Sequence, residues 1–432
     1  MLPQTYVADL PERIGTEATV RGWVVTTRSS GKIAFMVLRD GTGYLQCVLG
    51  KQETDPETWE RFRRAPQETA VAVTGMVRED ARSPGGAELS VSAVEILGEA
   101  VDFPITPKEH GTAFLFEHRH LWLRSRRQVA IMQIRHEVVQ AIRDFFYERH
   151  FVLVDTPILT GSIGESAGTL FETPYFDLGT AYLAQTGQLY LEAAAAALGR
   201  VYCFGPTFRA EKSKTRRHLT EFWMVEPEMA WYDSDDNMRL QEEFVSYIVG
   251  RCLERRAQDL LELERDTAPL ERVAPPFHRL SYTEAIRMLQ SLGSGIEWGA
   301  DLGADEETTL ASQYDRPVFV YDYPKAVRAF YMKENPADPR TVRNNDCLAP
   351  EGYGEIIGGS QREDDHDKLR ARIRELGLPE ENYAWYLDLR KFGTFVHSGF
   401  GLGVERTVAW ICGMPHIREA IAFPRMMTKL YP

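Results

Sequence analysis

The sequence is poor in cysteine, and its few cysteines are scattered. None of the five belongs to a CxxC pair; they are Cys47, Cys203, Cys252, Cys347 and Cys412. Disulfide frameworks and structural zinc sites need cysteines at short, regular spacing. We therefore expect neither in this chain.

Long apolar runs are also missing. No run is long and apolar enough to cross a bilayer, and the opening residues MLPQTYVADLPERIG lack the basic-then-apolar order of a secretory signal. The hydrophobic content of 44% and the charged content of 26% are typical of a soluble globular protein. These features predict a cytoplasmic protein with no membrane partner.

Positive charge is in deficit. The formal net charge of −13 argues against nonspecific coating of nucleic acid. It leaves room for a local basic track, and basic residues gather at 119–127 and 209–217. The phosphate-binding motif GxxxxGK[ST] is missing too, so any nucleotide has to be bound in another way.

The chain has 432 residues, which is too long for one hydrophobic core and predicts two or three domains. Residues 1–100 hold five short β-rich runs, with a polar helical segment at 56–64 between the third and fourth. This order suggests an OB-fold barrel, a fold that often stacks bases on exposed aromatic side chains. A linker at 101–127 follows, whose basic end is either a solvated hinge or a contact with an RNA backbone.

Residues 128–432 form the second predicted domain. Their strands and helices alternate without strict βαβ order, which favours an α+β fold with a mainly antiparallel sheet flanked by helices. We expect one long helix over 234–265, a loop and one strand over 342–362, and a Gly-rich turn leading into a buried helix over 398–411. Residues 266–315 are poorly specified.

The stretch from Val201 to Trp231 organises this domain. It holds two apolar strand-like runs joined by a basic loop. The Arg209 guanidinium can hold a phosphate, the Glu211 carboxylate can accept an adenine amino proton, and the Phe222 ring can lie flat on the base. An isolated hairpin of this kind is more simply a charged hairpin with solvated ends. Agreement with other stretches favours the nucleotide.

Two other stretches supply polar groups. In GFGLGVER, Gly401 and Gly403 permit close backbone approach at a helix N-terminus, and Arg406 can reach a phosphate. Asp346 and Glu355 are the best candidates for a divalent metal, because Mg²⁺ usually takes one or two carboxylates together with nucleotide phosphates. Either carboxylate alone would more often be solvated surface charge.

Three stretches, taken in order, resemble the motifs of class II aminoacyl-tRNA synthetases. FVLVDTPILT resembles motif 1, TFRAE with its basic loop and EFWMVEPE resembles motif 2, and GFGLGVER resembles motif 3. A barrel before these motifs is similar to the subgroup that charges aspartate, asparagine and lysine. The resemblance implies an OB-fold anticodon-binding domain, a class II catalytic domain and a homodimer. One departure is His150, which stands before motif 1 where the family usually has Gly.

The amino acid substrate can be argued within this subgroup. Aspartyl enzymes typically carry QSPQ followed two residues on by a Lys that meets the substrate carboxylate. Here the sequence is AQTGQLYLEAA, with Leu191 at the Lys position and Glu192 next to it. A neutral and an acidic residue at these positions disfavour a substrate whose side chain ends in a carboxylate, and favour one whose side chain ends in a carboxamide. With EFWMVEPE and APEGYGEIIGGSQR, this stretch resembles the asparaginyl-tRNA synthetases.

That resemblance implies ligation of L-asparagine to tRNA(Asn) through an asparaginyl-adenylate, with ATP and Mg²⁺. The implied catalytic residues are Arg209, Arg406 and Glu355. The implied ATP-binding residues are Arg209, Glu211, Arg217, His218, Leu219, Phe222, Glu355, Gly403, Val404, Glu405 and Arg406. The implied asparagine-binding residues are Glu165, Gln185, Gln188, Leu191, Glu192, Arg209, Glu226 and Arg362. The implied metal ligands are Asp346 and Glu355, and the implied anticodon contacts are Arg28, Phe35, Gln46 and Arg78.

Several alternatives stay open. Phe35 either stacks on a base or lies in the barrel core. An asparagine synthetase-like paralogue would lack the barrel. An aspartyl-tRNA synthetase of relaxed tRNA specificity is disfavoured by Leu191 and Glu192. A nucleic-acid-binding protein with an inactive nucleotide site is the remaining alternative, and the presence of all the matched polar residues argues against it.

Overall fold

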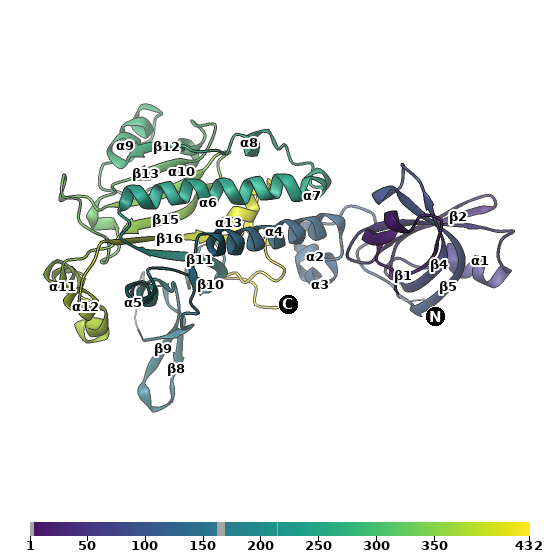
Figure 1. Ribbon diagram of the computed structural model, residues 1–432, viewed down its shortest axis with the longest axis horizontal. Coiled ribbons are helices and arrows are strands. Elements are labelled where there is room, and N and C mark those ends of the chain that lie inside the picture. The colour runs from purple at the N-terminus through teal and green to yellow at the C-terminus, as the bar shows by residue number, and fades with distance from the viewer. Residues whose placement is uncertain (1–3, 162–168, 214) are drawn as a thin grey trace. The chain divides into compact units, whose positions relative to one another are not determined.

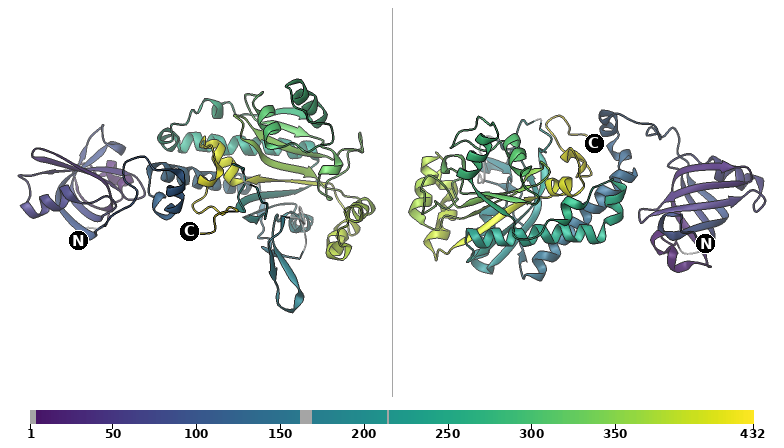
Figure 2. Two further views of the ribbon diagram at one scale, coloured as in Figure 1. Left: turned by 180° about the vertical axis from the view of Figure 1, so that it is seen from behind. Right: turned by 90° about the horizontal axis from the view of Figure 1, so that it is seen from above.

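The computed structural model describes residues 4–161, 169–213 and 215–432. The chain divides into two compact units, residues 1–112 and 113–432, which are described separately (Figures 1 and 2). This division falls inside the linker predicted at 101–127, whose bounds stay a prediction. Among the described helices, none combines the length and the hydrophobicity that a bilayer crossing requires.

The first unit is a closed five-stranded barrel. Its strands pair in the order β1-β2-β3-β5-β4. Their bounds are β1 Glu17–Ser30, β2 Ile33–Arg39, β3 Tyr44–Gly50, β4 Ala70–Glu79 and β5 Ala87–Gly98. Helix α1 (Pro56–Arg64) follows β3; its N-cap Asp55 accepts hydrogen bonds from two backbone N–H groups, and Trp59 and Phe62 pack into the barrel core. The predicted five strands and intervening helix are confirmed.

The second unit is built on an eight-stranded, mostly antiparallel sheet. The strand order is β12-β13-β14-β15-β16-β11-β10-β6, and only the β12/β13 and β10/β6 pairs are parallel. The bounds are β6 Val152–Leu153, β10 Arg200–Phe208, β11 Glu221–Ala230, β12 His278–Ser281, β13 Val318–Tyr321, β14 Asn344–Ala349, β15 Gly354–Gln361 and β16 His397–Gly403. A small sheet joins β7 Leu159–Thr160, β8 Glu172–Pro174 and β9 Thr180–Leu183.

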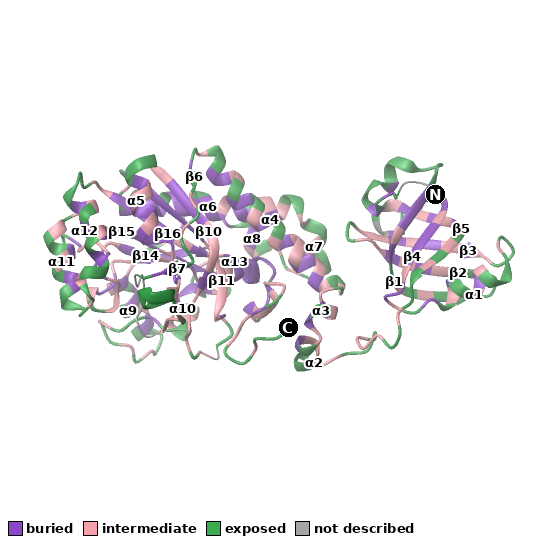
Figure 3. Cartoon of the chain, turned by 90° about the horizontal axis from the view of Figure 1, so that it is seen from below, coloured by how far each residue is buried: buried purple, intermediate pink, exposed green. Residues whose placement is uncertain are grey.

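Helices α4 (Arg126–Glu148) and α6 (Ser234–Arg255) run side by side along one face of this sheet (Figure 1). Together with α13 (Val404–Ile411) they bury the main apolar core, which includes Ile142, Phe244 and Trp410. Figure 3 shows buried residues along the strands and on the helix surfaces that face them. The other helices are α2 Thr112–Glu117, α3 Arg119–Trp122, α5 Gln188–Leu198, α7 Ala257–Glu262, α8 Ala268–Glu271, α9 Tyr282–Ser291, α10 Ala304–Ala311, α11 His366–Glu375 and α12 Ala384–Lys391.

Three of the expected elements were wrong in detail. The expected single helix over 234–265 is two helices, because Arg256 leaves the helical conformation at φ −123° and ψ 24°. The expected loop and strand over 342–362 are two paired strands, β14 and β15. The expected Gly-rich turn is strand β16 in the middle of the sheet. Glycine is needed there because a Cβ at Gly399 would overlap the Pro227 carbonyl oxygen and the Glu228 carboxylate of β11.

The departure at His150 has a structural cost. This residue ends α4 with φ +60°, in the left-handed region that favours glycine. Its N–H donates to the Tyr147 carbonyl at 3.0 Å, and the Phe151 N–H donates to the Phe146 carbonyl at 2.9 Å. The helix therefore ends in a hydrogen-bonded turn that a glycine would adopt without strain.

We expect His150→Gly to stabilise the second unit by about 1 kcal/mol, since the strain of an L-residue at positive φ is removed. The His150 side chain is exposed, so little packing is lost. Thermal unfolding followed by circular dichroism measures the change. Tyr147→Gly, in the same exposed last turn but inside the helix, is the control and is expected to destabilise. A lower melting temperature for His150→Gly would contradict the strain argument.

Candidate active site

A cavity lies beside β11, β15 and β16, next to the loop that joins β10 to β11. All the residues predicted to bind ATP line this cavity except Val404. The side chain of Val404 packs in the apolar core instead. Arg209, Phe222 and Arg406 come from distant parts of the chain and meet here. The sequence-based expectation that these three groups converge on one cleft therefore agrees with the geometry.

Arg209 has unused hydrogen-bonding capacity at this cavity. Its guanidinium lies 5.4 Å from the centre of the Phe222 ring. Its Nε is buried and has no hydrogen-bond partner among the described residues. A buried, unpaired guanidinium nitrogen is costly unless a ligand satisfies it. The unpaired Arg209 nitrogen therefore suits an anionic group of a ligand that lies beside the flat Phe222 ring.

Arg406 and His218 also line this cavity, each beside a carboxylate. Arg406 donates from Nη1 to the Glu355 carbonyl at 2.9 Å and to its carboxylate at 3.0 Å. His218 Nε2 lies 3.6 Å from the Glu211 carboxylate. Burial, and then the positive charge of Arg406, lower the pKa of His218, so its ring is neutral near pH 7. Together these groups can hold the charge of a polyphosphate.

A second cavity adjoins the first and shares Arg209, Met224, Glu355 and Gly401 with it. Of the predicted asparagine-binding residues, it is lined by Gln188, Leu191, Arg209, Glu226 and Arg362. Gln185 and Glu192 do not line it: Gln185 donates to the Thr169 hydroxyl at 2.8 Å, and Glu192 lies behind Gln188. Glu165 lies outside the described residues.

The wall of the second cavity is a buried ion pair. The Arg362 guanidinium donates to Glu228 from Nε at 3.1 Å and from Nη2 at 2.8 Å. Its Nη1 donates to the Ser360 hydroxyl at 2.6 Å. The two charged side chains are only 4% and 1% exposed. Sequence reasoning missed Glu228 as a site residue, although its two-residue spacing from Glu226 in EFWMVEPE puts both on one face of β11.

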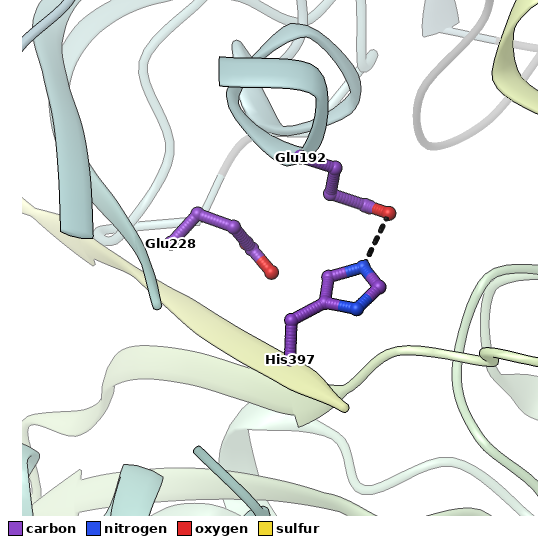
Figure 4. Close-up of side chains that lie close together, drawn as sticks. All are labelled: Glu192, Glu228 and His397. Atoms are coloured by element: carbon purple, nitrogen blue, oxygen red, sulfur yellow. Dashed lines mark hydrogen bonds and ion pairs between the residues drawn. The ribbon is translucent and has the colours of Figure 1, made fainter. Parts of the chain in front are cut away.

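Glu192 supports this wall from behind. It receives hydrogen bonds from Arg390 at 2.6 Å, from the Tyr386 hydroxyl at 2.7 Å and from His397 Nε2 at 3.0 Å. Figure 4 shows Glu192 and His397 joined and Glu228 beside them. Oxygen and nitrogen atoms of these three residues lie within 4.8 Å of one another, as in a metal centre. Two guanidinium groups already bind the carboxylates, however, and a cation would have to displace them. The cluster therefore fits a charge-balanced pocket wall better than a metal site.

The predicted magnesium ligands lie at the junction of the two cavities. Asp346 and Glu355 come from the paired strands β14 and β15. A Cβ at Gly358 would be 3.0 Å from Glu355 Oε1 and 3.7 Å from Asp346 Oδ1, so both carboxylates flank this glycine. Burial, with a further contribution from Glu355, raises the pKa of Asp346 to about 6. Hard oxygen donors whose charges repel each other suit Mg²⁺. Each carboxylate also has a guanidinium partner, Arg328 at 2.6 Å from Asp346 and Arg406 at 3.0 Å from Glu355, so a cation bound here would have to share the carboxylates with these arginines or displace them.

The barrel carries the four predicted anticodon contacts on its outer surface. In β2, Ala34 and Met36 point into the core while Phe35 between them is partly exposed. The alternative in which Phe35 lies in the barrel core does not agree with this geometry. Arg28 pairs with Phe35 across β1 and β2, with its guanidinium 4.7 Å from the ring centre. Gln46 and Arg78 each pair with Glu88, so they lie on the same side of the sheet.

Comparison with known protein families agrees with both units. Residues 112–427 match the family described as tRNA synthetases class II (D, K and N). Residues 18–97 match an OB-fold nucleic acid binding domain of the tRNA anticodon type. The chain belongs to the class II tRNA synthetases of the D, K and N group.

Within that class, the chain is similar over its full length to asparagine--tRNA ligases. The chain is 56% identical to the asparagine--tRNA ligase of Chloroflexus aurantiacus over the full length of both. It is 56% identical to that of Symbiobacterium thermophilum, with 98% of each chain covered. Among solved structures, asparaginyl-tRNA synthetase from Pyrococcus horikoshii complexed with asparaginyl-adenylate is 48% identical, with a TM-score of 0.97 and full coverage of both chains.

Proposed function

We propose that this chain ligates L-asparagine to tRNA(Asn) at the expense of ATP, through an asparaginyl-adenylate. Its full-length similarity to asparagine--tRNA ligases supports this function. The observation that carries it is the buried Glu228–Arg362 pair in a cavity that shares Arg209 with the nucleotide cavity. The barrel argues against an asparagine synthetase-like paralogue, and Leu191 at the expected lysine position argues against an aspartyl enzyme.

The first step needs positioning and charge stabilisation more than acid–base chemistry. The asparagine carboxylate is ionised at pH 7, attacks the α-phosphorus of ATP in line, and pyrophosphate leaves. Arg209, with its unpaired Nε, bridges the α-phosphate and the attacking carboxylate. Such a fixed cation stabilises the negative charge that develops on the phosphoryl oxygens. No general base is required.

The rest of the nucleotide cavity holds ATP. Glu211 accepts the adenine amino proton and Phe222 stacks on the base. Arg217, His218 and Arg406 bind the β- and γ-phosphates. Glu355 and Asp346 would hold Mg²⁺, which would supply positive charge to neutralise the phosphates.

Selection of asparagine follows from the pocket wall. Glu228 accepts a hydrogen bond from the carboxamide NH₂, and Arg362 donates a hydrogen bond to the carboxamide oxygen. An aspartate side chain brings a second negative charge to Glu228 and leaves an acceptor unpaired. A pocket with dedicated, buried polar partners discriminates by about 10⁴-fold or more. Gln188 and Glu165 hold the α-amino group.

The second step transfers the asparaginyl group to the 3′-OH of the terminal ribose of tRNA. The barrel reads the anticodon through Arg28, Phe35, Gln46 and Arg78, with Phe35 stacking on the middle base. We also propose that the protein acts in the cytoplasm as a homodimer whose interface includes the motif 1 strand β6, an exposed edge of the large sheet.

Pyrophosphate exchange with asparagine and aspartate in parallel tests this function. We expect ATP–pyrophosphate exchange that depends on asparagine, with a kcat/KM for aspartate at least about 10³-fold lower. Exchange with aspartate alone would contradict the amide-specific pocket. Exchange with neither amino acid would favour an inactive nucleotide site. Asparagine made from aspartate and ammonia without tRNA would favour the synthetase-like paralogue.

A further inference from the structure

Arg217 and Glu307 form an ion pair at the edge of the nucleotide cavity. Arg217 comes from the loop after β10 and lines the cavity, while Glu307 comes from α10, in a region with no recognised motif. The Arg217 Nη1 lies 3.2 Å from Glu307 Oε2, and the side chains are 21% and 16% exposed. An arginine proposed to bind phosphate is thus bound to a carboxylate of the protein itself.

The surroundings of this pair are shaped to hold it. The same Glu307 oxygen accepts a hydrogen bond from the Glu355 backbone N–H at 3.0 Å. The Arg217 Nη2 donates to the Thr308 hydroxyl and to the Gly352 carbonyl. Gly354 has φ +72°, and a Cβ there would overlap both Arg217 Nη1 and Glu307 Oε2. The turn between β14 and β15 therefore leaves the room that the pair occupies.

Burial and neighbouring carboxylates disfavour the negative charge of Glu307. The Glu307 side chain is only 16% exposed, and it contacts Glu355, whose backbone N–H donates to it at 3.0 Å. Asp346, in the wall of the adjoining second cavity, adds a third carboxylate nearby. The phosphates of a bound nucleotide would bring more negative charge to this region. A phosphate and the Glu307 carboxylate therefore compete for one guanidinium.

We propose that, in the enzyme without ATP, the Glu307 carboxylate binds Arg217 at the position that a phosphate group takes in the complex. It leaves Arg217 when the triphosphate binds. The inference rests on the proposed function through the phosphate-binding role of Arg217. Glu307 is a positioning residue: it keeps Arg217 in place before binding and, by competing, weakens the hold on ATP and on pyrophosphate. Weaker retention of pyrophosphate favours its release after the adenylate forms.

The test is the nucleotide affinity of Glu307→Gln, a variant that keeps the shape and the hydrogen-bond acceptor but removes the charge. Calorimetric titration with ATP and Mg²⁺, without amino acid, is expected to show a Kd lower by about fivefold, since a competing anion is removed. Inorganic pyrophosphate is expected to bind more tightly as well. The KM for asparagine in the exchange assay is expected to stay unchanged.

Glu306→Gln is the matched control, because it removes the same charge one residue earlier on α10 from a side chain with no ion pair among the described residues. We expect it to change the Kd for ATP by less than about twofold. In an Arg217→Met background, Glu307→Gln is expected to have no further effect, because the two changes act on one contact.

Three results would overturn the inference. An unchanged Kd in a folded Glu307→Gln protein would mean that the pair is only structural. An equal decrease in the Kd for ATP in Glu306→Gln would mean that the overall negative charge, and not the Arg217–Glu307 pair, sets the affinity. A higher Mg²⁺ requirement would make Glu307 a metal ligand. If Glu307→Gln fails to fold, Glu307→Asp takes its place, because the shorter side chain moves the carboxylate away from Arg217. The expected decrease in the Kd for ATP is then smaller. ATP binding is measured without asparagine, so loss of asparagine-dependent exchange would count against the proposed function alone.

Discussion

Arg209→Met is expected to lower kcat/KM in asparagine-dependent pyrophosphate exchange by about 10³-fold, equivalent to about 4 kcal/mol of transition-state stabilisation. The reason is that Arg209 carries a buried Nε without a partner among the described residues, beside the Phe222 ring, at the point shared by both cavities. The loss is expected mainly in kcat, since the developing phosphoryl charge is present only in the transition state.

Lys212→Met is the matched control, because Lys212 is an exposed cation on the same loop and lines neither cavity. It is expected to retain at least about half of the exchange activity, as exposed charges contribute little. Thermal unfolding verifies that both variants are folded. A fall of less than tenfold for folded Arg209→Met would remove Arg209 from its assigned role.

Glu228→Gln is expected to have the second large effect, on selectivity. Burial raises the pKa of Glu228, and the Arg362 guanidinium, which donates to this carboxylate at 2.8 Å, opposes the shift by favouring the charged form. Without this charge, Arg362 stays buried as an uncompensated cation, which disfavours the neutral amide and attracts a carboxylate. We expect the ratio of kcat/KM for asparagine over aspartate to fall by about 10²-fold or more.

Stability and selectivity can be separated with a second variant. Breaking one side of a buried ion pair costs about 3–5 kcal/mol, whereas replacing both partners is often neutral. Glu228→Gln with Arg362→Met is therefore expected to regain stability in urea unfolding but not to regain the preference for asparagine. Recovery of the preference for asparagine in the double variant would show that the pair serves folding and not recognition.

The sequence predicted those parts of the fold whose signals are local. The barrel strands and α1 follow from alternating apolar residues and an N-cap aspartate, and the meeting of Arg209, Phe222 and Arg406 follows from motif order. The Gly-rich strand β16 was mistaken for a turn because glycine carries no periodic side-chain pattern. Its conformation is set by its neighbours β11 and β15, which are distant in the sequence.

Other site features also depend on tertiary contacts. Glu228 differs from Glu226 only in the partners that the fold brings to it, and its guanidinium partner is 134 residues away. Glu307 lies on a short helix with no motif, and only the fold places it beside Arg217. Glu192 was predicted to bind asparagine from its position beside Leu191, but its hydrogen-bond partners place it behind the pocket wall. Ion pairs between residues this far apart in the sequence leave no local sequence signal.

Three glycines of β15 and β16, Gly358, Gly359 and Gly401, present bare main chain to the floor of the second cavity, and Gly399 of β16 lies beside the ion-pair wall. A methyl group at Gly399 would strike the backbone of β11, and one at Gly359 would press on Gln241, Asn237 and Phe400. Side-chain exchange in these strands therefore has no way to reshape the floor gradually. New substrates for this architecture would have to arise through changes in the walls, contributed by α5, β11 and the end of β15, while the floor is inherited unchanged.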